Sequence, residues 1–165
     1  LFPYTTLFRS KVENAFYHRI SLGTVNGEGH YSNKQLKFNQ FTSSWNGNYV
    51  IGEALLPVDF DIASPNAQRW HPNGELIVKS EGDFRSAVFL SEYLAETDSI
   101  IGDIKIHLGI QGPPDKLVRN GNIIIKNGKI FSVLMNEPVH HISASGDLID
   151  NQLSKIGRAS CRERV

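Results

Sequence analysis

Arg69, Trp70 and His71 follow one another in the irregular stretch 63–74 and bring together a planar hydrogen-bond donor, a stacking surface and a titratable ring. Long loops on rigid β scaffolds often carry binding surfaces. Such a trio suits a sugar, an aromatic ligand or a protein partner. Alternatively, Trp70 folds back and packs against one end of the fold, and the residues after His71 only form a turn.

Trp45 and Tyr49 flank a predicted hairpin tip at Asn46-Gly47. Their rings would extend the same binding surface if the two loops lie at the same end of the fold. The candidate ligand-binding residues are therefore Arg69, Trp70, His71, Trp45 and Tyr49.

Two carboxylates, Asp59 and Asp61, alternate with apolar residues in the segment 57–62. On a strand, both would face outward while Val58 and Phe60 face inward, and two such carboxylates could begin a calcium site. No Asp-x-Asp-x-Asp-Gly loop follows them. The pattern is more typical of a solvated acidic face with lysine or arginine opposite, so we expect no metal site and keep Asp59 and Asp61 as the alternative.

The histidines do not show metal-ligand spacing, because no two of them stand at i, i+2 on a predicted strand or at i, i+4 on a predicted helix. They are His18, His30, His71, His107, His140 and His141. The sequence also has no Gly-x-Ser-x-Gly, no phosphate-binding loop and no dinucleotide-binding glycine motif. We therefore expect no cofactor.

Composition describes one globular domain of ordinary polarity, with 165 residues, 40% hydrophobic and 21% charged, and zero formal net charge. No apolar run approaches the ~20 residues of a membrane-spanning helix, so we expect no membrane span. The single cysteine, Cys161, cannot form a disulfide within the chain.

Both ends of the chain are expected to be translated sequencing adapter. Residues 1–10 can be encoded by a common short-read adapter, and residues 156–165 by its reverse complement in another frame. We expect 11–155 to be a single β-rich domain, a fragment of a longer protein, with the two tails adding no specific core contacts. This insert is mildly acidic, which argues against a nucleic-acid partner.

Asn-Gly pairs give the strongest local signal, because both residues tolerate the positive φ of a type I′ hairpin turn. They occur at 26–27, 46–47, 73–74, 120–121 and 127–128. A turn at 46–47 places Phe41 opposite Gly52, an aromatic ring over a strand glycine. The predicted strands are 15–25, 28–38, 38–45, 48–56, 58–62, 75–80, 99–110, 121–126, 129–135 and 139–144.

This spacing predicts a mainly β fold, an antiparallel β-sandwich or partly closed barrel built from hairpins. At most one short helix is expected, over 83–96, where Asp83 would cap a face containing Phe84, Ala87 and Val88. The same residues also alternate as a strand, so helix and strand both remain open there.

The predicted hairpin 122–134 is apolar on both faces. Ile123, Ile125 and Ile130 share one face, while Ile124 and Phe131 lie on the other. Either this hairpin is central in a two-layer core, or one face forms an oligomer or domain contact.

Without catalytic motifs, the pattern favours a non-catalytic binding or structural module of a larger protein or assembly, which contacts a protein or carbohydrate partner through its loops. One alternative is a hydrolase or lyase that uses His71 with Asp59 and Asp61 in a β-scaffold cleft. Another is a carrier of a small apolar ligand, suggested by the aromatic and isoleucine content.

Overall fold

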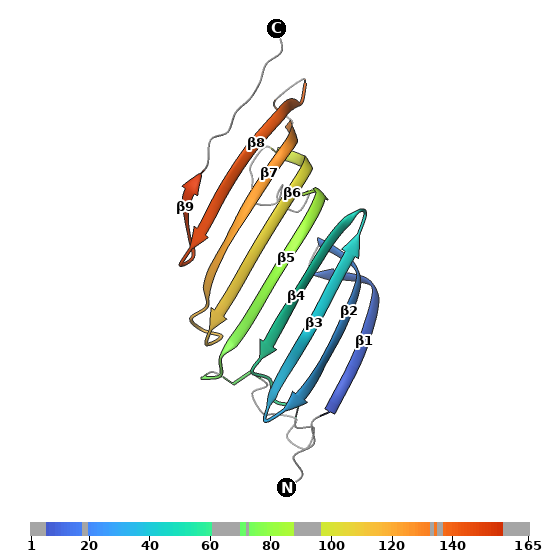
Figure 1. Cartoon of the computed structure of the whole chain (residues 1–165), viewed down its shortest axis with the longest axis vertical. Helices are drawn as coiled ribbons and strands as arrows, with labels where there is room; N and C mark the ends of the chain where they lie inside the picture. The colour runs from blue at the N-terminus through green and yellow to red at the C-terminus, as the bar shows by residue number, and fades with distance from the viewer. Residues whose placement is uncertain are drawn as a thin grey trace.

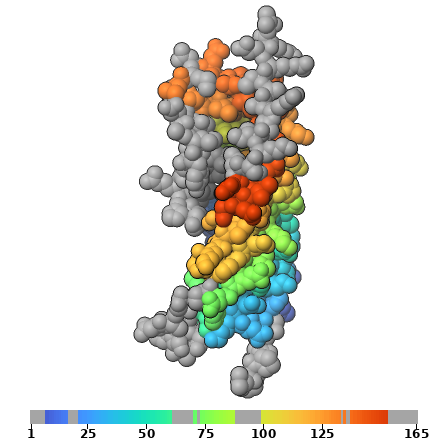
Figure 2. Space-filling view, turned by 90° about the vertical axis from the view of Figure 1, so that its left-hand side faces the viewer, coloured from blue at the N-terminus to red at the C-terminus, as the bar shows by residue number. Residues whose placement is uncertain are grey.

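The structure is a computed structural model that describes residues 6–17, 20–60, 70–71, 73–87, 97–132, 134 and 137–156. Within these residues, nine strands form one antiparallel sheet in which every strand lies beside its neighbours in the chain (Figure 1). The strands are β1 Thr6–Tyr17, β2 Ile20–Ser32, β3 Gln35–Trp45, β4 Asn48–Leu56, β5 Leu76–Ser86, β6 Thr97–Gly112, β7 Val118–Ser132, β8 Val139–Ile149 and β9 Gln152–Ile156. Seen from the side, the lower and middle parts of the molecule show light blue, green, yellow and red segments one above the other (Figure 2).

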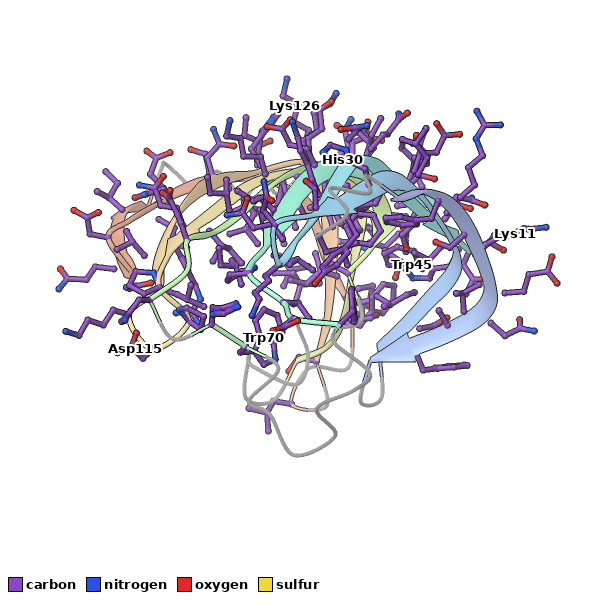
Figure 3. The ribbon with its side chains drawn as sticks, turned by 90° about the horizontal axis from the view of Figure 1, so that it is seen from below. Lys11, His30, Trp45, Trp70, Asp115 and Lys126 are labelled. Atoms are coloured by element: carbon purple, nitrogen blue, oxygen red, sulfur yellow. The ribbon has the colours of Figure 1, made fainter. Side chains whose placement is uncertain are left out.

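The sheet is bent into an arch when it is viewed along its longest axis (Figure 3). Trp45 and Trp70 lie inside the arch, whereas His30 and Lys126 lie on its outside. We call the face that carries Trp45 the concave face and the opposite face the convex face. Side chains alternate between them along each strand, and residues paired across strands share a face.

The convex face is charged. On β5 it carries Lys79, Glu81, Asp83 and Arg85. Cross-strand ion pairs join these residues to their neighbours, and their side chains are about half exposed or more. The pairs are Lys79–Glu53 at 3.1 Å, Arg85–Asp103 at 2.6 Å, Lys105–Asp83 at 3.2 Å and His107–Glu81 at 3.7 Å. Since exposed pairs of this kind add little stability, the face is mainly a solvated surface.

The concave face is apolar and holds the core. Phe84, Ala87, Ile100 and Ile104 form a buried cluster where the end of β5 meets the start of β6. Half-buried residues pack against it, among them Trp45, Val50, Ile106, Ile123, Ile125 and Ile130. Trp45 meets Phe84 edge-on at 5.9 Å between ring centroids.

Aromatic rings on this face cover glycines of the neighbouring strands. Phe41 lies opposite Gly52, as predicted, and a Cβ on that glycine would stand 2.6 Å from the ring. Phe38 covers Gly27 in the same way, with a hypothetical contact of 2.9 Å. The missing Cβ lets each ring lie flat on the strand beside it.

The expectation of antiparallel β structure is confirmed, but a sandwich of two sheets was wrong, and within the described residues the sheet is not closed into a barrel. All nine strands belong to one sheet, and in the described residues β1 pairs only with β2 and β9 only with β8. Each strand is joined to the next as a meander. The alternation of apolar and polar residues therefore marks two faces of one curved layer, not two layers.

The two-residue hairpin at Asn46-Gly47 is confirmed, and β4 has the predicted bounds. Its register agrees from Trp45 to Phe41 but not beyond. A bulge at Asn39 and Gln40 pairs Phe38 with Ala54, whereas the register of an uninterrupted two-residue hairpin would place Phe38 opposite Leu55.

The predicted turns at Asn26-Gly27 and Asn127-Gly128 were wrong. β2 runs through the first pair, with Asn26 beside Thr42, and the turn falls at Asn33-Lys34, where both φ angles are positive. β7 runs through the second pair, which forms a bulge with Asn127 at φ 53°. The left-handed conformation that Asn tolerates thus serves a bulge here.

This bulge nevertheless gives the predicted faces of 122–134. Asn127 and Gly128 stand opposite Gly102 alone, so the inward side changes from odd to even residue numbers. Ile123, Ile125 and Ile130 consequently all face the buried cluster. Ile124 lies on the convex face, so a contact there with another chain or domain stays a prediction.

A helix starting at Asp83 was wrong, because Asp83 and Phe84 continue β5 and pair with Lys105 and Ile104. Burial of Phe84 against Trp45 outweighs the local helix signal. Residues 88–96 lie outside the described residues. In the first expected tail, residues 6–10 form the start of β1 at the sheet edge, and Phe8 meets Phe38 edge-on at 5.3 Å.

Candidate functional site

Trp45 and Tyr49 point to opposite faces of the sheet. Trp45 pairs with Asn48 and packs on the concave face against Phe84. Tyr49 pairs with Asp83 on the convex face, where it is 43% exposed. The two rings therefore do not form one aromatic surface.

Trp70 and His71 lie beside the far end of β4. Trp70 forms an isolated bridge with Val58, and the His71 backbone N–H donates to the Pro57 carbonyl at 3.0 Å. Trp70 is 43% exposed, and the Nε2 atom of His71 is buried without a hydrogen-bond partner. Arg69 lies outside the described residues.

The full length of β4 separates this segment from the Asn46-Gly47 turn. Nine residues at about 3.3 Å each place the two predicted loops at opposite ends of the sheet. The structure thus does not bring Trp45 and Trp70 into one loop surface.

Asp59 departs from its expected orientation. It is buried at 8% exposure and forms an ion pair with Lys34 at 2.9 Å, while Phe60 is 49% exposed. The segment makes only the Val58 bridge instead of a strand, so strict alternation does not apply. The lysine partner was expected, and Asp61 lies outside the described residues.

We find no catalytic or metal-binding cluster of side chains in the described part of the chain. No group of three or more His, Cys, Asp or Glu residues there could hold a metal ion. The buried carboxylate of Asp59 pairs with Lys34, and the Nε2 atom of His71 has no hydrogen-bond partner.

The concave face is hollowed at two places along the arch. One hollow of about 240 Å³ is lined mainly by apolar residues of β3 to β6, namely Trp45, Val50, Gly82, Phe84, Ile106 and Leu108. Another of about 340 Å³ is lined by Phe8, Tyr31, Leu36 and Phe60. The rings of Tyr31 and Phe60 meet at a tilt of 56° with their centroids 5.2 Å apart, and the Phe60 N–H donates to the Tyr31 hydroxyl at 3.1 Å.

Incomplete burial distinguishes this face from a packed interior. Ile104 is 1% exposed, but Val50, Ile106, Leu108 and Ile123 around it are only half-buried. A closed core would bury such side chains almost completely. The concave face therefore presents an apolar trough beside a small buried cluster.

A hollow of about 730 Å³ on the convex face has a different character. Its charged lining residues are Glu53, Lys79, Glu81 and His107, which form two of the exposed ion pairs described above. Gly109, which has no side chain, is also part of its lining. This open surface contains no group that the structure singles out for chemistry.

Sequence reasoning looked for a site in loops and missed the trough. The available signal was the inward row of isoleucines on 99–110 and 121–126, which was expected either in a two-layer core or in a contact with another chain or domain. The bulge at Asn127-Gly128, beside this row, was predicted as a turn.

Comparisons with protein-family models, with curated proteins and with solved structures found no match for this chain. Among the described residues, no helix is long and apolar enough to cross a membrane.

Proposed function

We propose that the chain is a non-catalytic binding module whose concave face holds an elongated apolar ligand, such as an alkyl chain. One observation carries the proposal: apolar side chains line hollows along a curved face and remain partly exposed. Covering them with an alkyl chain would gain about 25 cal/mol for each Å² of apolar surface removed from water.

The shape of the face supports an extended ligand. The arch runs along the longest axis of the molecule, and successive strands contribute inward apolar residues along it. An alkyl chain can follow such a trough without any hydrogen-bonding group, which suits the nearly apolar lining of the Tyr31 and Phe60 hollow.

Contact with a protein or carbohydrate through the loops, and hydrolysis or elimination at His71 and Asp59, stay predictions. A partner polypeptide seated on the concave face is the main competitor for the trough, since an exposed apolar face can also bind protein.

Fluorescence of the methyl ester of cis-parinaric acid tests the proposal, because this uncharged polyene brightens when it leaves water. Val50→Ser and Ile51→Ser form a matched pair, since these neighbours lie on the concave and convex faces. We expect saturable binding that Val50→Ser weakens several-fold and Ile51→Ser leaves unchanged. No binding, or equal weakening by both variants, would contradict the proposal.

A further inference from the structure

Arg119 is a charged residue on the concave face, which is mainly apolar. It pairs with Ile110 on β6, which follows Ile106 and Leu108 on the inward side of that strand. Among the residues paired in β2 to β8, the register places no other charged side chain on this face. Arg119 is exposed, so its charge stands in water at the end of this apolar row.

The partner that the structure gives Arg119 is neutral. Its backbone N–H and its Nη1 atom donate to the Oδ1 atom of Asn151, at 3.0 and 3.2 Å. Asn151 is itself held in place, because its Nδ2 atom donates to the Leu117 carbonyl at 3.0 Å. This contact orients the guanidinium at the start of β7 and uses one of its five N–H donors.

Arg85 on the convex face differs from Arg119 in the partner of its guanidinium. Its Nη1 atom lies 2.6 Å from the Asp103 carboxylate, so its charge is compensated by the protein. Among the described residues, no carboxylate lies within ion-pair distance of Arg119. An exposed, oriented guanidinium without a carboxylate partner is suited to bind an anion.

We propose that Arg119 anchors the anionic end of an amphiphile, a carboxylate or a phosphate monoester, whose alkyl chain lies along the concave face. This inference rests on the proposed function and adds a class of ligand and an orientation to it. The anion binds at the start of β7, and the chain extends from Ile110 over Leu108 and Ile106.

Paired probes test the role of the charge. cis-Parinaric acid at neutral pH and its methyl ester share one chain and differ in the carboxylate. We expect the wild-type chain to bind the acid about tenfold more tightly, the order expected for one hydrogen bond to a charged group. Competition by dodecanoate and by dodecyl phosphate, with dodecanol as the neutral control, distinguishes the two anions.

Arg119→Gln removes the charge of Arg119, and Arg119→Lys keeps it. As a control, Arg85→Gln removes a charge on the convex face. We expect Arg119→Gln to lose the acid-over-ester preference while its affinity for the ester stays unchanged. Arg119→Lys should keep part of the preference, and Arg85→Gln all of it. Circular dichroism checks that each variant is folded.

The outcomes separate this inference from the function on which it rests. If the wild-type chain binds both probes equally, or if Arg119→Gln keeps the preference, the anchoring role is overturned while the trough stands. If neither probe binds the wild-type chain, the proposed function fails and the anchor fails with it.

Discussion

Lys34 and Asp59 form an ion pair in which only one partner is withdrawn from water. The Asp59 side chain is 12% exposed and that of Lys34 is 60% exposed. Lys105 and Asp83 make a comparable contact, but both side chains are well exposed. The two pairs therefore compare a salt bridge that has a buried carboxylate with an exposed one.

We predict that Lys34→Ala lowers the free energy of unfolding by about 1–3 kcal/mol, because it removes the cation facing a buried carboxylate. Lys105→Ala should cost less than about 1 kcal/mol, as expected for an exposed pair. Urea denaturation at neutral pH measures both values. Equal losses would show that burial of Asp59 does not strengthen this pair.

The glycines under aromatic rings define a second test at single positions. A Cβ at Gly52 would meet the Lys79 carbonyl and lie 2.6 Å from the Phe41 ring. A Cβ at Gly109 would meet only the Asn120 carbonyl oxygen, at 3.6 Å. We expect Gly52→Ala to destabilise the fold by about 1–3 kcal/mol through overpacking. Gly109→Ala should change stability by less than about 0.5 kcal/mol in the same urea experiment.

Among the elements, β7 shows what the sequence could and could not reveal. The presence of strands around Asn46-Gly47 and the ring of Phe41 over Gly52 were predictable, because a short turn fixes its own register. The same dipeptide at 127–128 fits a turn and a bulge equally well locally. Pairing with both β6 and β8 decides between them, and such long-range pairing is not visible in one sequence.

The site was less predictable than the fold for a related reason. Inward positions such as Ile104 and Ile106 follow from alternation alone. Whether a second layer covers them depends on the curvature of the sheet, which local patterns do not encode. The binding residues proposed in loops were chosen for their chemistry, and Trp45 then fell on the concave face by register.

The bulge in β7 makes a direct prediction. Asn127→Gly keeps the positive φ and loses only an exposed hydrogen bond from Nδ2 to Asp103 at 3.2 Å, so we expect a loss below about 1 kcal/mol. Asn127→Val forces a β-branched residue into the left-handed region and should cost about 1–3 kcal/mol. Thermal unfolding of the two variants measures the difference, and equal stability would contradict a strained bulge.

At the scale of the whole molecule, the two faces of the sheet differ in polarity. Exposed ion pairs lie on the convex face, and the apolar trough follows the concave face over several strands. Residues 6–10, the expected tail, form the outer edge of the sheet in β1, where Phe8 also lines one of the two hollows.

We predict that a chain of residues 11–155 keeps the fold and loses little stability relative to 1–165. The start of β1 pairs on one side only, and its Phe8 contact with Phe38 is a single ring pair. A loss of about 1 kcal/mol would lower the melting temperature by about 2–4 °C in a chain of this size. A fall several times larger would show that the end segments are part of the core.

Quenching of Trp45 by a methyl stearate brominated at mid-chain tests most directly whether the concave face binds an alkyl chain. In Trp70→Phe, Trp45 is the one remaining tryptophan. A control chain with W45F, W70F and Y49W carries its reporter on the convex face instead. We predict saturable quenching of Trp45 and none of the convex reporter. An unquenched Trp45, or equal quenching of both reporters, would contradict a concave binding trough.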